Sequence, residues 1–358
     1  MAVRHRTTKL QKLEAPSAQI IEHTRPSTQP PPKPTQRLGC CGRFIITLLA
    51  LYVISMVGLR SCNWLQQAVT YVHHVRQPFF RNLSDLASFG MNGTIEFELF
   101  HEDGCGIEVW HVLPNFYHGN INSESHKDDF IKALSDSAPI LLYLHGNTGT
   151  RAISHRLEVY KFFTQKGYHV LTFDYRGFAN SQCYPSERGM MEDAQLLWNW
   201  IKNKAPNSKV YIWGHSLGSA AATYLTKELC GLGSLPNGLI LDAPFTDIAD
   251  AGANHPFSLP FWPIMPIFKH FILDAFTEKF NSIERVKHIT VPMLILHGQR
   301  DGLIPFYIGE KFHRMALEYK KDHPEMGEVE FVDCGEAGHK TNHLSPAAQE
   351  ALDRFITV

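Results

Sequence analysis

The stretch Val210-Tyr-Ile-Trp-Gly-His-Ser-Leu-Gly218 decides the fold of this chain. An apolar, β-rich run ends in Gly214-x-Ser216-x-Gly218, and a run of small residues that suits a helix follows at once. This is the nucleophile-elbow pattern, in which a sharp strand-to-helix turn lifts a serine hydroxyl above a sheet. Side chains at the two glycine positions would collide across such a turn. The stretch therefore predicts a strand, a strained turn at Ser216 and a helix.

A serine hydroxyl is a weak nucleophile at neutral pH, so it needs a base, a group that orients the base, and donors for the oxyanion. Two later stretches, 291–298 and 328–333, are typical of strands, and the loops that follow them hold Asp301 and His339. The order serine, acid, histidine, each on the loop after a strand, is the one expected beside a nucleophile elbow. It predicts Ser216 as nucleophile, His339 as general base and Asp301 as the group that holds the imidazole tautomer.

The oxyanion donors are predicted from an earlier strand. Pro139-Ile-Leu-Leu-Tyr-Leu-His-Gly-Asn147 is a buried apolar run that ends in a His-Gly turn. A backbone amide of such a turn is expected to pair with the amide that follows the nucleophile. The backbone N–H groups of Asn147 and Leu217 are therefore the predicted oxyanion hole.

Other assignments remain open at this point. Asp242 also ends an apolar run, and Asp333 lies at the end of the last predicted strand, so both are rival acids. His343 is the rival base, four residues beyond His339. Ser216 could also be an ordinary buried serine in a non-catalytic relative of the same fold.

Composition excludes several classes of function. The formal net charge of the 358 residues is −1, with no basic excess of the kind that nucleic-acid binding requires. Seven cysteines in a chain of this length do not predict a disulfide framework. The sequence has no His-Glu-x-x-His motif and no paired Cys-x-x-Cys spacing, so no metal or other cofactor is predicted.

The first 60 residues predict a tail and a membrane anchor. Residues 1–43 are rich in Pro, Ser, Thr and Gln and hold eight Lys or Arg against two acids, which is typical of a disordered tail. Residues 44–59 are uncharged and lie between Arg43 and Arg60. Sixteen residues span about 24 Å as a helix, which is short for a hydrocarbon core of about 30 Å. A single-pass signal anchor over 44–60 is favoured over a cleaved signal peptide or a buried helix, and Arg60 can snorkel at its end.

The charge asymmetry predicts the orientation of this anchor. The basic residues precede the apolar segment, so the N-terminus is expected in the cytosol and the rest of the chain in the lumen or outside the cell. Two glycosylation sequons, at Asn82 and Asn92, follow the anchor and permit this topology. Cys40 and Cys41 lie at the cytosolic edge, where they are either palmitoylated or plain cysteines.

The remaining chain predicts a doubly wound α/β domain over residues 94–358, preceded by a mostly helical connection over 61–93. Residues 94–100 and 107–112 alternate with period two around a turn, which predicts an antiparallel hairpin. Apolar strand runs then alternate with helical patterns, as in a mostly parallel sheet with helices on both faces. Ser186 is expected to cap one helix, and a last helix is expected from Pro346 to Ile356.

Residues 251–282 break this alternation. Four prolines in this stretch, at 256, 260, 263 and 266, exclude a long helix. It holds more large apolar side chains than a water-exposed stretch normally carries, which indicates that they line a cavity or a binding surface. We interpret the stretch as an apolar cap over an acyl-chain channel that touches the bilayer; packing over the sheet edge is the alternative. The candidate lipid-binding residues are Phe257, Phe261, Trp262 and Phe268.

From about residue 75 to its end, the chain resembles the membrane-anchored α/β-hydrolase-domain lipases that cleave lysophosphatidylserine and monoacylglycerols. The stretches that carry this resemblance are Leu144-His-Gly-Asn-Thr-Gly-Thr-Arg151, Phe173-Asp-Tyr-Arg-Gly177, Pro185-Ser-Glu-Arg-Gly189, Tyr211-Ile-Trp-Gly-His-Ser-Leu-Gly218 and His255-Pro-Phe-Ser258. The catalytic residues of that family fall on Ser216, Asp301 and His339. The loops around Asp301 (Gln-Arg-Asp-Gly) and His339 (Glu-Ala-Gly-His-Lys-Thr) depart from the family pattern without removing a catalytic group.

The resemblance implies an α/β-hydrolase fold and a serine esterase that needs no cofactor and takes a lipid substrate from the bilayer. It further implies a place in the endoplasmic reticulum membrane with a lumenal domain, or in the plasma membrane with an extracellular one. Two alternatives stay open: a thioesterase that deacylates palmitoylated proteins, and a non-catalytic scaffold with the same fold.

Overall fold

The computed structural model describes residues 40–117, 119–121 and 125–357. By its internal contacts the chain divides after Ala50. The described part of the first unit, residues 40–50, forms the first turns of helix α1 (Cys40–Ser61), and all that follows from Leu51 forms the second unit.

An eight-stranded sheet forms the centre of the second unit, in the order β1-β2-β4-β3-β5-β6-β7-β8. Its strands are β1 (Thr94–Phe100), β2 (Gly106–Val112), β3 (Ile140–Leu144), β4 (His169–Asp174), β5 (Val210–His215), β6 (Gly238–Asp242), β7 (Met293–His297) and β8 (Val329–Asp333). Strand β2 pairs antiparallel with β1 and β4, and all other pairs are parallel. The predicted hairpin and the mostly parallel sheet are both confirmed.

The register brings the ends of the parallel strands to one edge. His215 at the end of β5 pairs with Asp242 at the end of β6, and His297 at the end of β7 pairs with Asp333 at the end of β8. In open α/β sheets, ligands bind outside the carboxyl ends of the strands. The loops that follow β3, β5, β7 and β8 therefore meet at the edge where such a site is expected.

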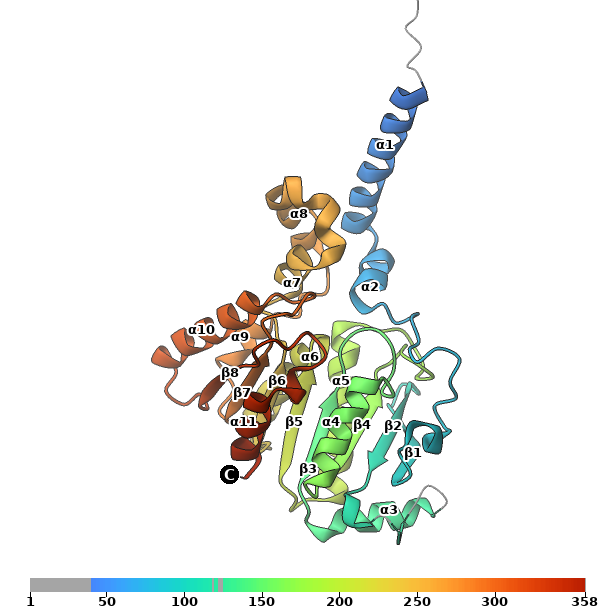
Figure 1. The fold of residues 1–358 in the computed structure, drawn as a ribbon, viewed down its shortest axis with the longest axis vertical. Helices are drawn as coiled ribbons and strands as arrows, with labels where there is room; N and C mark the ends of the chain where they lie inside the picture. The colour runs from blue at the N-terminus through green and yellow to red at the C-terminus, as the bar shows by residue number, and fades with distance from the viewer. Residues whose placement is uncertain (1–39, 118, 122–124, 358) are drawn as a thin grey trace, which may run out of the picture. The chain divides into compact units, whose positions relative to one another are not determined.

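Two hydrophobic cores lie on opposite faces of the sheet, because successive strand residues point to opposite sides. In β3, Leu142 belongs to one core and Leu141 and Tyr143 belong to the other. Helices α5, α6, α9 and α10 contribute to the first core, and α4 and α11 contribute to the second, where Figure 1 shows them in front of the sheet. Beyond α1, the helices among the described residues are α2 (Asn63–Tyr71), α3 (Lys127–Ala133), α4 (Ser154–Gln165), α5 (Glu187–Lys204), α6 (Leu217–Leu232), α7 (Ile248–Asn254), α8 (Met265–Phe271), α9 (Ser282–Val286), α10 (Phe306–Asp322) and α11 (Pro346–Thr357).

Helix α5 begins where its sequence predicts. The hydroxyl of Ser186 accepts a hydrogen bond from the Gly189 N–H at 3.0 Å, which satisfies one of the free donors of the first turn. The closing helix α11 likewise begins at Pro346, as expected.

The proline-rich stretch forms short helical pieces instead of a strand–helix unit. After α7 come the 3₁₀ segment η4 (Pro256–Ile264), helix α8 and the 3₁₀ segment η5 (Leu273–Ala275). Pro260 and Pro263 lie inside η4, where a tight 3₁₀ turn forms in place of an α-helix. We call residues 256–275 the cap.

Helix α1 is longer than the uncharged segment that predicts it. Its 22 residues span about 33 Å, which is enough for a hydrocarbon core of about 30 Å. By length and composition, Cys41–Ser61 could cross a membrane. Of the predicted tail, residues 1–39 lie outside the described residues and residues 40–43 form the start of α1.

The connection over 61–93 is less helical than expected. It contains α2 and one 3₁₀ segment (Leu86–Phe89), whereas residues 72–85 form turns and irregular backbone. Helix α2 ends at Tyr71, and the carbonyls of Tyr71, Val75 and Gln77 accept hydrogen bonds from the loop after β3. Pro78 disfavours helix for the residue before it.

A disulfide joins Cys105, at the start of β2, to Cys183, in the loop before α5. The sequence does not predict this pair, because the two cysteines are 78 residues apart and spacing alone does not give connectivity. Closing a loop of this length stabilises the folded chain by about 4 kcal/mol in the chain-entropy account.

Candidate active site

Ser216 lies in a strained turn between β5 and α6. Its backbone has φ of +52° and ψ of −121°, in a region that residues other than glycine rarely adopt. A Cβ at Gly218 would lie 2.1 Å from the carbonyl oxygen of Leu144, and one at Gly214 would lie 2.5 Å from the carbonyl oxygen of Gly218. Both glycines are therefore sterically required, as the sequence pattern predicts.

The structure brings Ser216, His339 and Asp301 into one hydrogen-bonded chain. His339 Nε2 lies 2.9 Å from Ser216 Oγ, and His339 Nδ1 lies 2.7 Å from Asp301 Oδ2. The three side chains come from the loops after β5, β8 and β7, so the parallel register places them at one edge of the sheet. This is the geometry in which a carboxylate fixes the imidazole tautomer and Nε2 is free to take a hydroxyl proton.

Asp301 is held as a carboxylate. Its Oδ1 accepts the N–H groups of Leu303 and Ile304, each at 2.8 Å, and its Oδ2 lies 3.4 Å from His297 Nε2. Burial by itself would raise the pKa of Asp301, but the hydrogen bonds with His297 and His339 outweigh it and hold the pKa below its usual value. Asp301 is thus a permanently charged partner for an imidazolium.

The rival residues lie elsewhere. The Asp242 carboxylate accepts the side-chain amide of Asn342 at 2.7 Å, and Asp333 accepts the side-chain amide of Gln299 at 2.6 Å. His343 lies 3.3 Å from Glu158 and forms no hydrogen bond with Ser216. None of the three rivals takes part in the series of hydrogen bonds that runs from Ser216 through His339 to Asp301.

The loop after β3 carries Asn147, one of the two predicted oxyanion donors, and the connection before β1 holds this loop from outside. The N–H groups of Thr148, Gly149 and Thr150 donate to the carbonyls of residues 71, 75 and 77, at 3.2, 2.8 and 2.9 Å. The irregular backbone after α2 therefore acts as a brace for the loop.

A buried arginine holds the same loop from inside. The Arg156 guanidinium donates to the carbonyls of Thr150 at 2.6 Å, Thr148 at 2.9 Å and Gly146 at 3.2 Å. The side chain is 1% exposed, so these carbonyls replace water as its partners. The position of the Asn147 amide thus depends on contacts from two directions.

Comparison with known proteins agrees with this geometry. Residues 139–259 match the family model of the α/β-hydrolase fold. The chain is 39% identical over 322 residues to lysophosphatidylserine lipase ABHD12 of Danio rerio, covering 88% of this chain and 83% of that protein. The chain belongs to the ABHD12 family of α/β hydrolases. It is also 40% identical over 323 residues to the protein of the same name from Rattus norvegicus, covering 88% of this chain and 79% of the relative.

Solved structures show the same fold at lower identity. An esterase of Pyrococcus furiosus has a TM-score of 0.57 and 20% identity, with 79% of this chain and 97% of that chain covered. An α/β hydrolase of Vibrio vulnificus has a TM-score of 0.58 and 17% identity, with 82% and 91% covered. They support the fold assignment of this ABHD12 family member.

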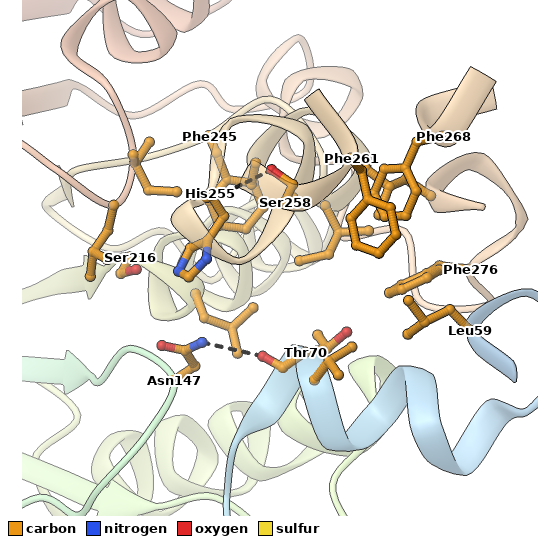
Figure 2. Close-up of a pocket in the computed structure, with 18 of the residues that line it drawn as sticks. Leu59, Thr70, Asn147, Ser216, Phe245, His255, Ser258, Phe261, Phe268 and Phe276 are labelled. Atoms are coloured by element: carbon orange, nitrogen blue, oxygen red, sulfur yellow. Dashed lines mark hydrogen bonds between the residues drawn. The ribbon is translucent and has the colours of Figure 1, made fainter. Parts of the chain in front are cut away.

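An apolar cavity of about 240 Å³ opens at Ser216 and His339. Asn147 and Leu217 line it together with the serine. Apolar side chains of the cap and of the loop after β6, Phe245 among them, form much of the rest (Figure 2). Phe261 and Phe268 of the cap stack with ring centroids 4.0 Å apart. The lining residues away from the serine include Leu59, Val69, Phe245, Ile248, Ala251, Leu273 and Phe276.

Two of the four predicted lipid-binding residues lie in this wall. Phe261 and Phe268 line the cavity. Trp262 does not, because its side chain points outward and is 56% exposed. The side chain of Phe257 lies outside the described part of the chain.

The sequence gives no local signal for the wall that comes from the N-terminal side. Leu59 of α1 and Val69 and Thr70 of α2 line the cavity, although they lie about 150 residues before Ser216. Thr70 also accepts the side-chain amide of Asn147 through its carbonyl, at 3.3 Å. The end of α1 is therefore part of the cavity wall in this family member.

A buried glutamine joins this end of α1 to the segment that follows the cap. The Gln66 side-chain amide donates to the Leu59 carbonyl at 2.8 Å, and its oxygen accepts the Thr277 N–H at 3.0 Å. The side chain is 1% exposed. One side chain thus satisfies two backbone groups: the Leu59 carbonyl, which the end of α1 leaves free, and the Thr277 N–H.

We predict that Asp242→Asn changes how stability depends on pH. Burial raises the pKa of Asp242 to about 7, despite the hydrogen bond from Asn342 that lowers it. In the unfolded chain the pKa is about 4. The folded state therefore binds a proton more tightly, and the wild type loses stability as pH rises from about 4 to about 7. The difference in melting temperature between the detergent-solubilised Asp242→Asn variant and wild type should therefore shift in favour of the variant as pH rises across this range.

The matched control is Asp333→Asn, which neutralises an exposed carboxyl at the end of β8. It shows what the loss of a carboxyl at a neighbouring strand end does to the melting temperature without the burial of Asp242. A difference between Asp242→Asn and wild type that stays constant from about pH 4 to about pH 7 would contradict the raised pKa of Asp242.

Proposed function

We propose that this member of the ABHD12 family is a membrane-bound serine hydrolase that cleaves the single acyl ester of lysophospholipids, lysophosphatidylserine among them, and of monoacylglycerols. The observation that carries the proposal is the hydrogen-bonded chain from Ser216 through His339 to Asp301 at the mouth of an apolar cavity. The names of the relatives, lysophosphatidylserine lipases, support the substrate class.

In this proposal His339 Nε2 takes the Ser216 proton while Oγ attacks the ester carbonyl carbon. Asp301 accepts the Nδ1–H and stabilises the imidazolium that forms. The tetrahedral intermediate then collapses: the bond to the alcohol oxygen breaks, and His339 returns the proton to that oxygen. Water, activated by His339, hydrolyses the acyl-enzyme and releases the fatty acid.

The N–H groups of Asn147 and Leu217 would stabilise the oxyanion. Both residues line the cavity beside Ser216, and Leu217 is the first residue of α6, where helix N–H groups lack intrahelical partners. Losing one oxyanion donor typically costs about 2.7–4 kcal/mol of transition-state stabilisation. The braces on the Asn147 loop would maintain this contribution.

Substitution of two proposed catalytic residues, Ser216 and Asp301, and of the rival acid Asp242 tests the mechanism. With lysophosphatidylserine presented to membranes that carry the protein, Ser216→Ala should abolish fatty-acid release. Asp301→Asn should lower kcat by about 10⁴-fold, because the imidazole tautomer is no longer fixed. Asp242→Asn should stay within about tenfold of wild type, since Asp242 bonds to Asn342 and not to His339.

Serine-independent release would contradict the mechanism. A larger loss of kcat in Asp242→Asn than in Asp301→Asn would mean that Asp242, and not Asp301, is the acid that orients His339. If wild-type membranes released fatty acid from neither lysophospholipids nor monoacylglycerols, the lipase proposal would fail and protein deacylation would be tested next.

The apolar cavity is the proposed site for the acyl chain. It starts at Ser216 and leads between the cap and the end of α1, where the tilted rings of Tyr52 and Phe261 have centroids 5.0 Å apart. Val53, Ile54 and Val57 of α1 are more than half exposed, as a lipid-facing surface requires. The cap also exposes apolar side chains, Leu259, Trp262, Ile267 and Phe271. A substrate acyl chain would thus pass from the leaflet into the cavity without crossing water.

We predict that Leu59→Trp lowers activity on long-chain substrates selectively. The larger ring would fill part of the cavity wall away from Ser216, so a short acyl ester would still reach the serine. The kcat/KM ratio of an octadecenoyl to a butanoyl monoacylglycerol should fall about tenfold, the scale of a few methylenes in an apolar pocket. Val57→Trp is the matched control, because Val57 is 59% exposed on the same helix. An unchanged ratio in Leu59→Trp would exclude this path for the chain.

We also propose that the N-terminus faces the cytosol and the hydrolase domain faces the lumen of the endoplasmic reticulum. Three observations support this topology: the basic residues before α1, the disulfide between Cys105 and Cys183, and the exposed side chains of Asn82 and Asn92. Disulfides persist in oxidising compartments and are rare in the cytosol.

Glycosidase treatment tests this topology. N-glycosidase digestion of the protein from eukaryotic membranes should increase its gel mobility, and Asn82→Gln with Asn92→Gln should remove the shift. Without reduction, Cys105 and Cys183 should resist alkylation, whereas exposed Cys62 should react. No glycosidase shift together with alkylation of all three cysteines would place the domain in the cytosol.

A further inference from the structure

A second cavity, of about 180 Å³, meets the apolar one at the active serine. The two share Ser216, His339, Asn147 and Leu303. Away from these residues their walls differ: the apolar cavity continues along aliphatic and aromatic side chains, whereas the second has polar side chains and loop backbone. Its remaining lining residues are Gln77, Gly146, Thr148, Ile153, His155, Arg156, His215 and Lys340.

The wall of this polar cavity is cationic. It contains Arg156 and Lys340 and no aspartate or glutamate. Burial lowers the pKa of His155 and of His215, so both rings are neutral at neutral pH and the positive charge comes from the arginine and the lysine. A small cavity with one sign of charge and low-dielectric walls concentrates the field on a ligand inside it.

The two cations have different tasks. Arg156 is buried, and the loop carbonyls already occupy its terminal nitrogens, so it contributes charge but few free donors. Lys340 is exposed and forms no ion pair or hydrogen bond with any residue in the described part of the chain. Its ammonium group, one residue after His339, is therefore free to bind an anion at the serine. Gln77 lies in the same wall and adds a neutral amide.

We propose that this polar cavity binds the anionic phosphodiester head group of a lysophospholipid, with Lys340 as its direct counter-ion. The inference rests on the proposed function, because the acyl ester must lie at Ser216 for the two cavities to receive the two ends of one molecule. The acyl chain of the substrate then lies in the apolar cavity, and its ester lies at Ser216, where the two cavities meet. The glycerophosphate lies in the polar cavity, within the electrostatic field of Arg156. A monoacylglycerol fills the same junction but brings no charge to Lys340. Lys340 is thus a specificity-determining residue.

Comparison of charged and neutral substrates with one acyl chain tests this site. In detergent-solubilised full-length protein, Lys340→Met should lower kcat/KM for oleoyl lysophosphatidylserine about five- to tenfold, in the range of a partly exposed charged hydrogen bond. With oleoyl monoacylglycerol, kcat/KM should stay within about twofold. Lys340→Arg should retain the preference of the wild type, and Lys340→Glu should reduce it further, because the charge is reversed.

The control variant is Lys161→Met, which removes an exposed charge from α4 outside the cavity and should leave both substrates unaffected. Equal losses on both substrates in Lys340→Met would mean that the residue affects catalysis through His339, and this would overturn the head-group site. No loss on either substrate would overturn it as well. If the wild type hydrolysed neither substrate, the proposed function itself would fail, which is a separate result.

Discussion

The backbone of Ser216 is the constraint on which the rest of the site depends. At φ of +52° a serine is held in a conformation that costs about 1–3 kcal/mol, and the surrounding structure must maintain it. Gly218 packs directly against the Leu144 carbonyl at the end of β3. The Ser216 N–H donates to the Asp242 carbonyl at the end of β6, at 2.8 Å. The strands on both sides of β5 thus hold the turn, and the hydroxyl is raised to the edge where the acid and histidine loops converge.

From this turn the site extends in two directions that suit an amphiphile. On one side the cap and the end of α1 form an apolar wall, and Gln66 bonds both to the end of α1 and to Thr277, just after the cap. On the other side the loop after β3, fixed by Arg156, forms a polar and cationic wall. A lysolipid has the same division, with its ester between chain and head group. In our proposal helix α1 has two tasks: it would keep the enzyme at the membrane, and its residue Leu59, which lines the apolar cavity, would contact the substrate.

The sequence predicts most of the features of this fold that depend on short stretches of chain or on the order of the parallel strands. The nucleophile turn, the strands that lead to Asp301 and His339, and the Ser186 cap all follow from short patterns, because each depends on neighbours in sequence or on the order of strands. Contacts between distant segments do not follow in this way. Nothing in the spacing of Cys105 and Cys183 indicates their pairing, and helix α2 ends at Tyr71 where a longer helical connection is expected. The cap aromatics are predicted as a group, but only the fold separates the inward Phe261 from the outward Trp262.

Labelling with a fluorophosphonate tests the central claim most directly, because the reagent phosphonylates a serine that a base has activated, with loss of fluoride. We predict that the full-length protein in membranes forms one adduct, located on Ser216 by mass spectrometry of the peptide that contains it. Prior incubation with excess lysophosphatidylserine should slow its formation, and Asp301→Asn should slow it more. An adduct on another serine, or none on a folded chain, would contradict the account of Ser216 as an activated nucleophile.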